Sequence, residues 1–333
     1  MNRTVLTSRK AWHAERSTGI GASEAAAILG VSPWHSPLSL FYLKRGEAPP
    51  NQGEEFARRL GLELEDAIAK LWSGETRRKY RRPEPGTFWL DRHATKPFMV
   101  ASIDGECADA PDVDELDDVL EIKTAAISKA SHWIDEPPID YIVQVQHQLA
   151  VTGKNRAALV GLIGGVSLRY ADIQRDPEFI EMLEEACAEF WRRVELNDPP
   201  PADGSDATRS LLGRLYPTAR PTSATLPPES LEWDQDRQRA ADEIKKWEGV
   251  KAEAENKLKA AIADNAQGIL PNGVVYTLKE QTRAAHIVKE SKFRALRRVA
   301  PKGEKMARSA AALKDRDLKA DFAAQESGDE PWA

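Results

Sequence analysis

The apolar positions of the first two hundred residues follow two different periods. Over 54–72 they recur one helical turn apart, which predicts the clearest early helix. Shorter apolar runs between loop-forming residues predict strands at 76–82, 87–92, 98–104, 119–123, 157–162 and 166–173. Further helices are predicted at 22–29, 37–45, 139–152 and 177–195. Strands interleaved with helices indicate an α/β core with a mixed sheet.

The pattern changes after residue 196. Residues 197–228 contain seven prolines and are interpreted as a linker or an extended arm. Apolar spacings of three and four then predict a long helix of coiled-coil character. The turn signal Pro271-Asn272-Gly273 predicts a β-hairpin near 268–281, and a basic helix is expected near 287–299. We therefore expect a domain over 1–196, a linker over 197–228 and a mainly α-helical extension over 229–333.

Composition limits the kinds of protein and of metal site. The 333 residues carry 53 Asp and Glu against 47 Lys and Arg, a formal net charge of −6. The sequence has no long apolar run and begins without an apolar signal segment, so we expect no membrane span and a cytoplasmic protein. Two cysteines cannot form a disulfide framework or a four-cysteine metal site, and the six histidines show no H-E-x-x-H pattern. Any metal must therefore be held mainly by oxygen ligands, and such ligands suit Mg²⁺ or Mn²⁺.

Charge is unevenly distributed along the chain. Residues 77–82 hold five Lys and Arg, residues 104–118 hold eight acids without a Lys or Arg, and residues 283–308 hold nine Lys and Arg. The net acidity argues against a protein that simply coats nucleic acid. Basic segments beside an acidic cluster suit an enzyme that attracts a polyanion and acts on it with a carboxylate-held metal. Solvated surface charge is the alternative interpretation of each run.

One pattern indicates metal-dependent chemistry. Glu121 and Lys123 lie two apart on a predicted strand and therefore share a face, with Ile122 packed behind them. If the strand that ends at Asp104 pairs with this one, two carboxylates and an ammonium meet, as in a metal-dependent phosphodiesterase. A cross-strand charge pair is the alternative. Asp117 and Asp118 compete for the first carboxylate, and Asp104 is favoured because Gly105 follows it and lets the backbone approach a ligand.

Three further features are ambiguous by themselves. Arg16 and Ser23 flank a glycine turn that runs into a helix, which suits an anion site, although Ser23 could simply cap the helix. Glu65 lies in the helix 54–72 and could be a solvated charge. Gln144 lies on a helix with an apolar side, so it belongs either to a polar site or to a structural network. The basic run 77–82 offers phosphate contacts.

Together and in this order, the motifs resemble the YqaJ/lambda-exonuclease family of viral recombination nucleases, within the PD-(D/E)xK superfamily. The resemblance covers about residues 8–196. The motifs that carry it are Arg16…Gly19-Ile-Gly-Ala-Ser23-Glu24, Gly61-Leu-Glu-Leu-Glu65, Ser102-Ile-Asp104-Gly105, Glu121-Ile-Lys123 and Tyr141-Ile-Val-Gln144-Val-Gln146. It implies a PD-(D/E)xK restriction-endonuclease-like α/β core with a central mixed sheet flanked by helices, followed here by a helical extension with a β-hairpin.

The resemblance also implies roles for individual residues. Asp104 and Glu121 would bind Mg²⁺, with Mn²⁺ as a substitute, and the carbonyl of Ile122 would complete the ligand set. Lys123 would orient or help deprotonate the attacking water. Glu65 would be the helix-borne acid near the metals, and Gln144 would contact the reacting end. The residues implied to hold the terminal 5′-phosphate are Arg16, Ser23 and Ser102.

The activity implied by the resemblance is digestion of one strand of linear duplex DNA from its 5′ end. The product is a 3′ single strand for an annealing protein, and the implied assembly is a ring-shaped trimer in the cytoplasm of a bacterial host, encoded by a phage or prophage. An endonuclease of the same superfamily and an inactive DNA-end-binding scaffold are the alternatives. Two departures are the Ile103 that stands where many members have proline, and the chain after about residue 200, whose role stays open.

Overall fold

The computed structural model describes residues 2–48, 55–133, 136–285, 290 and 294–299. The chain divides into two compact units, Met1–Pro217 and Thr218–Ala333, and each is described by itself. Within the described ranges, no helix is both long and apolar enough to cross a membrane.

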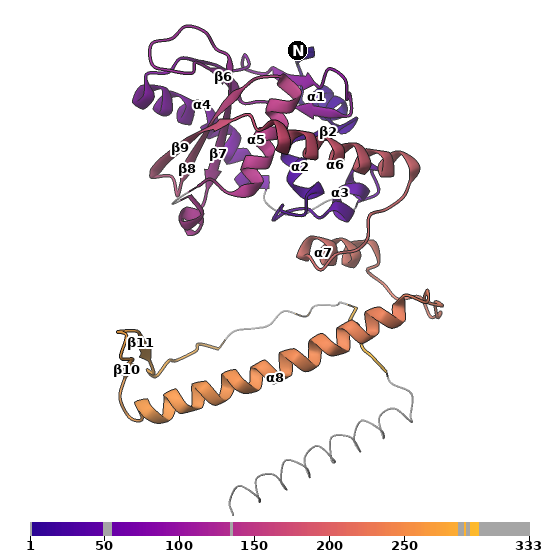
Figure 1. Cartoon of the computed structure of the whole chain (residues 1–333), viewed down its shortest axis with the longest axis vertical. Helices are drawn as coiled ribbons and strands as arrows, with labels where there is room; N and C mark the ends of the chain where they lie inside the picture. The colour runs from indigo at the N-terminus through magenta and orange to yellow at the C-terminus, as the bar shows by residue number, and fades with distance from the viewer. Residues whose placement is uncertain (1, 49–54, 134–135, 286–289, 291–293, 300–333) are drawn as a thin grey trace, which may run out of the picture. The chain divides into compact units, whose positions relative to one another are not determined.

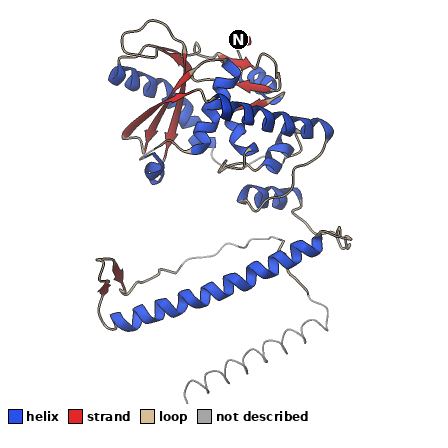
Figure 2. Ribbon diagram, in the orientation of Figure 1, coloured by secondary structure: helices blue, strands red, loops and turns tan. Residues whose placement is uncertain are grey.

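A five-stranded mixed sheet forms the centre of the first unit (Figure 2). Strands β7 (Asp118–Ala125) and β8 (Arg156–Ile163) are parallel, and every other pair is antiparallel. The remaining strands, in the sheet order β3-β6-β7-β8-β9, are β3 (Tyr80–Arg81), β6 (Gly105–Cys107) and β9 (Ser167–Gln174). Most of β8 is buried, as expected for an apolar strand covered on both faces. The predicted α/β core with a mixed sheet is confirmed.

A second sheet of four strands lies in the same unit. Its order is β1 (Asn2–Leu6), β4 (Phe88–Arg92), β5 (Met99–Ala101) and β2 (Ile20–Gly21). The chain leaves this sheet after Ala101 and enters the five-stranded sheet at Gly105, so Ser102–Asp104 form a crossing segment without strand structure. The prediction of one strand over 98–104 is therefore wrong beyond Ala101. Its apolar part stops where the chain changes sheets.

Helices pack on both faces of the five-stranded sheet (Figure 1). The helices of the first unit are α1 (Arg9–Ser17), α2 (Ala22–Ile28), α3 (Pro37–Lys44), α4 (Glu55–Thr76), η1 (Ile127–Trp133), α5 (Ile139–Thr152), α6 (Pro177–Leu196) and α7 (Asp206–Leu215). Val119 of β7 packs in the cluster of α2, α5 and α6, whereas Leu120 and Ile122 pack with Ile68 and Trp72 of α4. The odd-numbered residues of β7 therefore face α5, and the even-numbered residues face α4.

Helix α7 lies inside the segment predicted as a Pro-rich linker. Ser205 caps it by accepting a hydrogen bond from the backbone N–H of Thr208 (3.1 Å). The Thr208 hydroxyl donates to the Ser36 hydroxyl (2.7 Å), and Leu211 is fully buried. The flanking prolines indicate an extended chain, but the capped segment between them is short, amphipathic and packed against α3.

The second unit contains the long helix α8 (Ser230–Ile262) and a two-stranded hairpin, β10 (Gln267–Ile269) with β11 (Val275–Thr277). Gly273 has φ +85°, the left-handed conformation that the predicted turn requires. The helix and the hairpin are confirmed. Residues 290 and 294–299 are not helical, and the rest of the basic helix predicted for 287–299 lies outside the described residues.

Candidate active site

Strand β7 places Glu121 and Lys123 on the face that α5 covers. Glu121 is 2% exposed, although it is charged. One carboxylate oxygen, Oε1, accepts hydrogen bonds from Lys123 Nζ (2.5 Å) and from Gln144 Nε2 (2.5 Å). The other oxygen, Oε2, accepts from Gln148 Nε2 (2.5 Å). Lys123 Nζ also donates to Gln144 Oε1 (2.9 Å), so these two partners of the buried carboxylate orient each other.

Asp104 joins this group from the crossing segment. Its Oδ2 accepts a hydrogen bond from the backbone N–H of Ile122 (2.8 Å), the residue between Glu121 and Lys123. The antiparallel register of β6 and β7 pairs Gly105 with Leu120, which holds Asp104 beside this stretch of β7. We call Asp104, Glu121, Lys123, Gln144 and Gln148 the Glu121 cluster.

The competing aspartates lie elsewhere. Asp118 begins β7 and binds Arg78 (3.1 Å) and Arg156 (2.7 Å). Asp117 has a side chain that is 73% exposed and contacts Lys154 (3.3 Å). Neither aspartate contacts a member of the Glu121 cluster, so Asp104 is the aspartate that accompanies Glu121.

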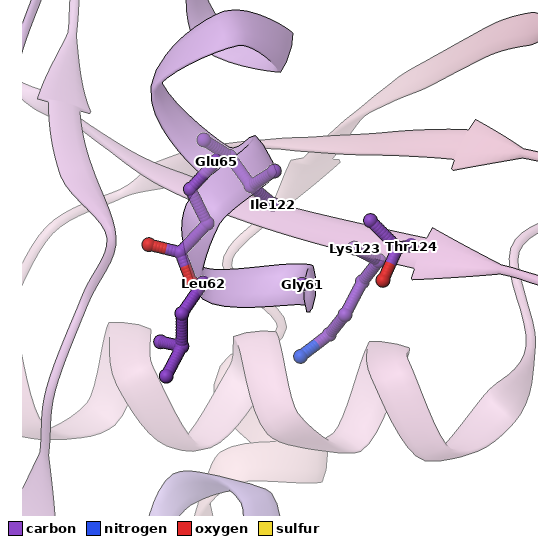
Figure 3. Close-up of a pocket in the computed structure, with 6 residues that line it drawn as sticks. All are labelled: Gly61, Leu62, Glu65, Ile122, Lys123 and Thr124. Carbon is purple, nitrogen blue, oxygen red and sulfur yellow. The ribbon is translucent and has the colours of Figure 1, made fainter. Parts of the chain in front are cut away.

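Glu65 approaches the cluster from α4. Its carboxylate pairs with Arg82, and Arg82 Nε donates to the backbone oxygen of Asp104 (3.1 Å). Glu65 of α4 and Lys123 of β7 both line an open hollow of about 200 Å³. Figure 3 shows the lining residues, which come from α4 and from the end of β7. Gly61 lines this hollow, and a Cβ there would lie 3.3 Å from the Thr124 hydroxyl. The missing side chain therefore lets the helix approach the strand closely.

Crowding of carboxylates changes the proton affinity of the site. Burial, followed by the charges of Glu121 and Glu65, raises the pKa of Asp104 well above its usual value. Burial also raises the pKa of Glu65 to about 7, although Arg82 opposes the shift. Burial lowers the pKa of Lys123, but Glu121 and Asp104 outweigh it and leave that pKa raised. Three carboxylates, those of Asp104, Glu121 and Glu65, lie beside two cations, Lys123 and Arg82, so in their ionised forms they carry more negative charge than these cations neutralise.

A divalent cation fits this surplus of negative charge. The available donors are carboxylate and carbonyl oxygens, which Mg²⁺ prefers, and Mg²⁺ binds through one or two carboxylates while it keeps several waters. Among the described residues, no three His, Cys, Asp or Glu side chains converge as a ready-made cage. Asp104 and Glu121 lie on either side of the Ile122 backbone and are the carboxylates that could hold such a partly hydrated ion.

A second group of side chains surrounds the glycine turn. Arg16 Nη2 donates to the Ser23 hydroxyl (2.5 Å), and the Arg16 guanidinium lies 5.1 Å from the ring centroid of Trp12. Trp12 Nε1 donates to the Ser102 hydroxyl (2.7 Å). We call Trp12, Arg16, Ser23 and Ser102 the Arg16 cluster. A Cβ at Gly21 would lie 2.8 Å from Arg16 Nε, so the glycine makes room for the guanidinium.

The proposed capping role of Ser23 is not observed. Gly21 is the N-cap of α2, and the Glu24 carboxylate accepts a hydrogen bond from its N–H (2.6 Å). Ser23 is exposed and accepts from Arg16 instead. The three residues implied to bind a phosphate, Arg16, Ser23 and Ser102, are therefore brought together through Trp12.

The Lys and Arg side chains of the basic run 77–82 form ion pairs with acidic residues of the first unit. Four of its five cations pair with acids of the segment 104–118, and Arg82 pairs with Glu65. The pairs are Arg77–Asp112 (3.7 Å), Arg78–Asp118 (3.1 Å), Lys79–Asp114, Arg81–Glu106 (2.5 Å) and Arg82–Glu65. We call the first four the β3 charge pairs. In the described structure each of these cations is paired with an acid, and the expectation that the run offers phosphate contacts stays a prediction.

Three partners of the site carry no clear signal in the sequence. Gln148 lies four residues after Gln144, so helical spacing alone could have placed both on one face. Trp12 lies four residues before Arg16 on α1, so helical spacing places these two side chains near each other, but its bond to Ser102 joins segments 90 residues apart. Arg82 likewise reaches the backbone of Asp104 from a different element, and only the tertiary structure identifies these contacts.

Comparison with known proteins gives a consistent family. The family described as the YqaJ-like viral recombinase domain matches residues 11–155. Over 274 residues the chain is 33% identical to the uncharacterized protein YqaJ of Bacillus subtilis (strain 168), covering 80% of this chain and 82% of that protein.

Solved structures with a similar fold include two exonucleases. An alkaline exonuclease from Laribacter hongkongensis is 21% identical, with a TM-score of 0.43, over 57% of this chain and 94% of that one. A putative exonuclease from Eubacterium rectale is 11% identical, with a TM-score of 0.41, over 68% of this chain and 98% of that one.

Proposed function

The chain belongs to the YqaJ-like viral recombinase family, and from this premise we propose that it is a Mg²⁺-dependent 5′→3′ exonuclease. It degrades one strand of linear double-stranded DNA from a 5′-phosphorylated end and leaves a 3′ single strand. One observation carries the proposal: Asp104, Glu121 and Lys123 meet around Ile122 in one hydrogen-bonded cluster beside an open hollow.

In this proposal Asp104, Glu121 and the Ile122 carbonyl hold Mg²⁺, with Mn²⁺ as a substitute. Held there, such an ion would lower the pKa of a bound water and would stabilise negative charge on the phosphate. Lys123 Nζ, whose raised pKa keeps it protonated, would orient that water by donating a hydrogen bond to it. Gln144, which contacts both Lys123 and Glu121, lies where the reacting end of the strand arrives. Glu65, across the hollow, is the additional acid.

In this proposal the Arg16 cluster binds the terminal 5′-phosphate and so makes digestion depend on a free DNA end. Arg16 and Ser23 now bind each other, and a terminal phosphate offers both a better partner, because guanidinium and hydroxyl groups match phosphate oxygens. Ser102 lies on the same crossing segment as Asp104, so an anchored terminus places the adjacent phosphodiester beside the Glu121 cluster. Anchoring of this kind fixes register without reading a base sequence.

The cellular setting completes the proposal. The 3′ strand passes to a single-strand annealing protein, and the exonuclease acts as a homo-oligomer, a ring-shaped trimer, in the cytoplasm of a bacterial host that carries the phage or prophage. The proposed nuclease domain spans 1–196, and the region after the segment 197–228 serves as an extension.

Digestion of linear duplex with each end blocked in turn, with and without Mg²⁺, tests the proposal. We expect products only with the metal and only from open 5′-phosphorylated ends. Covalently closed circular duplex, which has no ends, is the control substrate. Rapid cutting of this circle would identify an endonuclease instead. Binding to duplex ends without any digestion would identify an inactive scaffold.

A further inference from the structure

Gln148 is buried in α5, one turn beyond Gln144, and contacts the Glu121 cluster with only one end of its amide. The residue is 0% exposed, and its Nε2 donates to Glu121 Oε2 (2.5 Å). Its Oε1 is buried without a hydrogen-bond partner among the described residues. An unpaired buried carbonyl lowers stability, so this position does not serve the fold alone.

Gln146, two residues earlier, shows what a structural glutamine looks like in this helix. It is 4% exposed, and both ends of its amide are paired. Nε2 donates to the backbone oxygen of Gln174 (2.7 Å), and Oε1 accepts from the backbone N–H of Asp176 (3.1 Å). These bonds connect α5 to the segment between β9 and α6. Gln148 has no comparable contact with another element besides Glu121.

The hydrogen bonds around Glu121 divide its two oxygens. A carboxylate has about four lone-pair sites, two on each oxygen. Oε1 already accepts from Lys123 and Gln144, whereas Oε2 accepts only from Gln148. Oε2 therefore keeps a free lone pair that could bind a cation. The hydrogen bond from Gln148 fixes the direction of that lone pair. Because its amide is neutral, Gln148 orients Glu121 without competing for the carboxylate charge.

We propose that Gln148 is a positioning residue that holds Glu121 for a divalent cation. This inference rests on the proposed function, in which Glu121 is a metal ligand. Partners that hydrogen-bond a ligating carboxylate commonly change metal affinity by about 10–100-fold when they are removed. Gln148 thus sets the metal concentration that the protein needs, whereas Gln144 contacts both Glu121 and Lys123.

The test compares Gln148→Met with Gln146→Met in the full chain. Methionine keeps the length of the side chain and removes the amide. Mn²⁺ binding is measured by isothermal titration calorimetry, and digestion of 5′-phosphorylated linear duplex is measured over a range of Mg²⁺ concentrations. Thermal unfolding without metal reports folding. Gln148→Asn, which keeps an amide but withdraws it from Glu121, serves as the second variant if Gln148→Met does not fold.

We expect Gln148→Met to bind Mn²⁺ about tenfold more weakly and to need about tenfold more Mg²⁺ for half-maximal digestion, with the rate restored at high Mg²⁺. Gln146→Met should lose thermal stability and keep the wild-type metal dependence. Wild-type metal affinity in a folded Gln148 variant would overturn the inference and leave the proposed function standing. A wild-type chain that neither binds Mn²⁺ nor digests DNA would instead remove the proposed function and this inference with it.

Discussion

The β3 charge pairs and the Glu121 cluster are both rich in charge, but their charges are balanced differently. Each cation of the β3 charge pairs contacts an acid of the segment 104–118. Around Glu121, three carboxylates share two cations, Lys123 and Arg82, and the remaining donors are neutral amides. Balanced pairs stabilise a fold, whereas surplus negative charge beside an open hollow provides a place for a cation. The predictions below test this difference.

The largest effect is expected from Glu121→Gln, which removes the charge of the proposed ligand and keeps its size. Digestion of linear duplex should fall by at least about 100-fold, because stabilisation of the reacting phosphate is lost. DNA binding, measured by gel shift, should persist. Asp114→Asn is the control, since Asp114 is 88% exposed and pairs only with Lys79. If Glu121→Gln digests DNA as fast as Asp114→Asn, the active site lies elsewhere.

Arg78→Ala tests the structural side of the comparison. The Arg78 and Asp118 side chains are each 7% exposed, so the substitution leaves a buried carboxylate with one fewer partner. We expect a loss of about 3 kcal/mol in the free energy of unfolding. Urea unfolding followed by tryptophan fluorescence measures it, and Arg77→Ala, at a 71% exposed side chain, should change little. Equal losses in the two variants would contradict the assignment of Arg78 to the core of the fold.

The stability of the fold should fall in acid because of one buried neutral side chain, His147. His147 lies on α5 with Nε2 3.2 Å from the Val100 carbonyl, and burial lowers its pKa from 6.5 to about 4. The unfolded chain therefore binds more protons between these values, so the contribution of His147 is complete above pH 6.5 and is lost as pH falls toward 4.

The lowered pKa of His147 corresponds to a loss of about 3 kcal/mol in the free energy of unfolding when the pH falls from above 6.5 to below 4. His147→Gln keeps a donor and does not titrate, so it should lose less stability on acidification than the wild type does. Chemical unfolding at a series of pH values provides the comparison. Parallel curves for the two proteins would exclude His147 as the source.

The smallest expected effect concerns the Arg16 cluster. Arg16→Ala removes the charged partner of a terminal phosphate, so the preference for 5′-phosphorylated over 5′-hydroxyl ends should fall by about tenfold. Initial rates on the two substrates measure the ratio. Lys10→Ala, on the same helix, should leave the ratio unchanged. An unaltered ratio in Arg16→Ala would reject the anchoring role and leave the metal site untouched.

The part of the site that a local pattern specifies could be predicted from the sequence. Alternation along a strand gives the shared face of Glu121 and Lys123, and Ile122 packs behind them as that alternation requires. Asp104 was placed correctly beside them, although the strand ends three residues earlier, at Ala101.

The rest depends on contacts between distant segments. Arg78 binds Asp172, which is 94 residues away, and no local pattern assigns the basic run to such partners. Short strands such as β6, with three residues, carry too little periodicity to be recognised. Helix α7 was missed because prolines on both sides dominate its composition.

The crossing segment Ser102–Asp104 links the two clusters through the backbone itself. Two residues of backbone span at most about 7 Å, and they join Ser102 of the Arg16 cluster to Asp104 of the Glu121 cluster. In the proposed reaction, this short covalent connection would limit the distance between an anchored terminal phosphate and the bond that is cut.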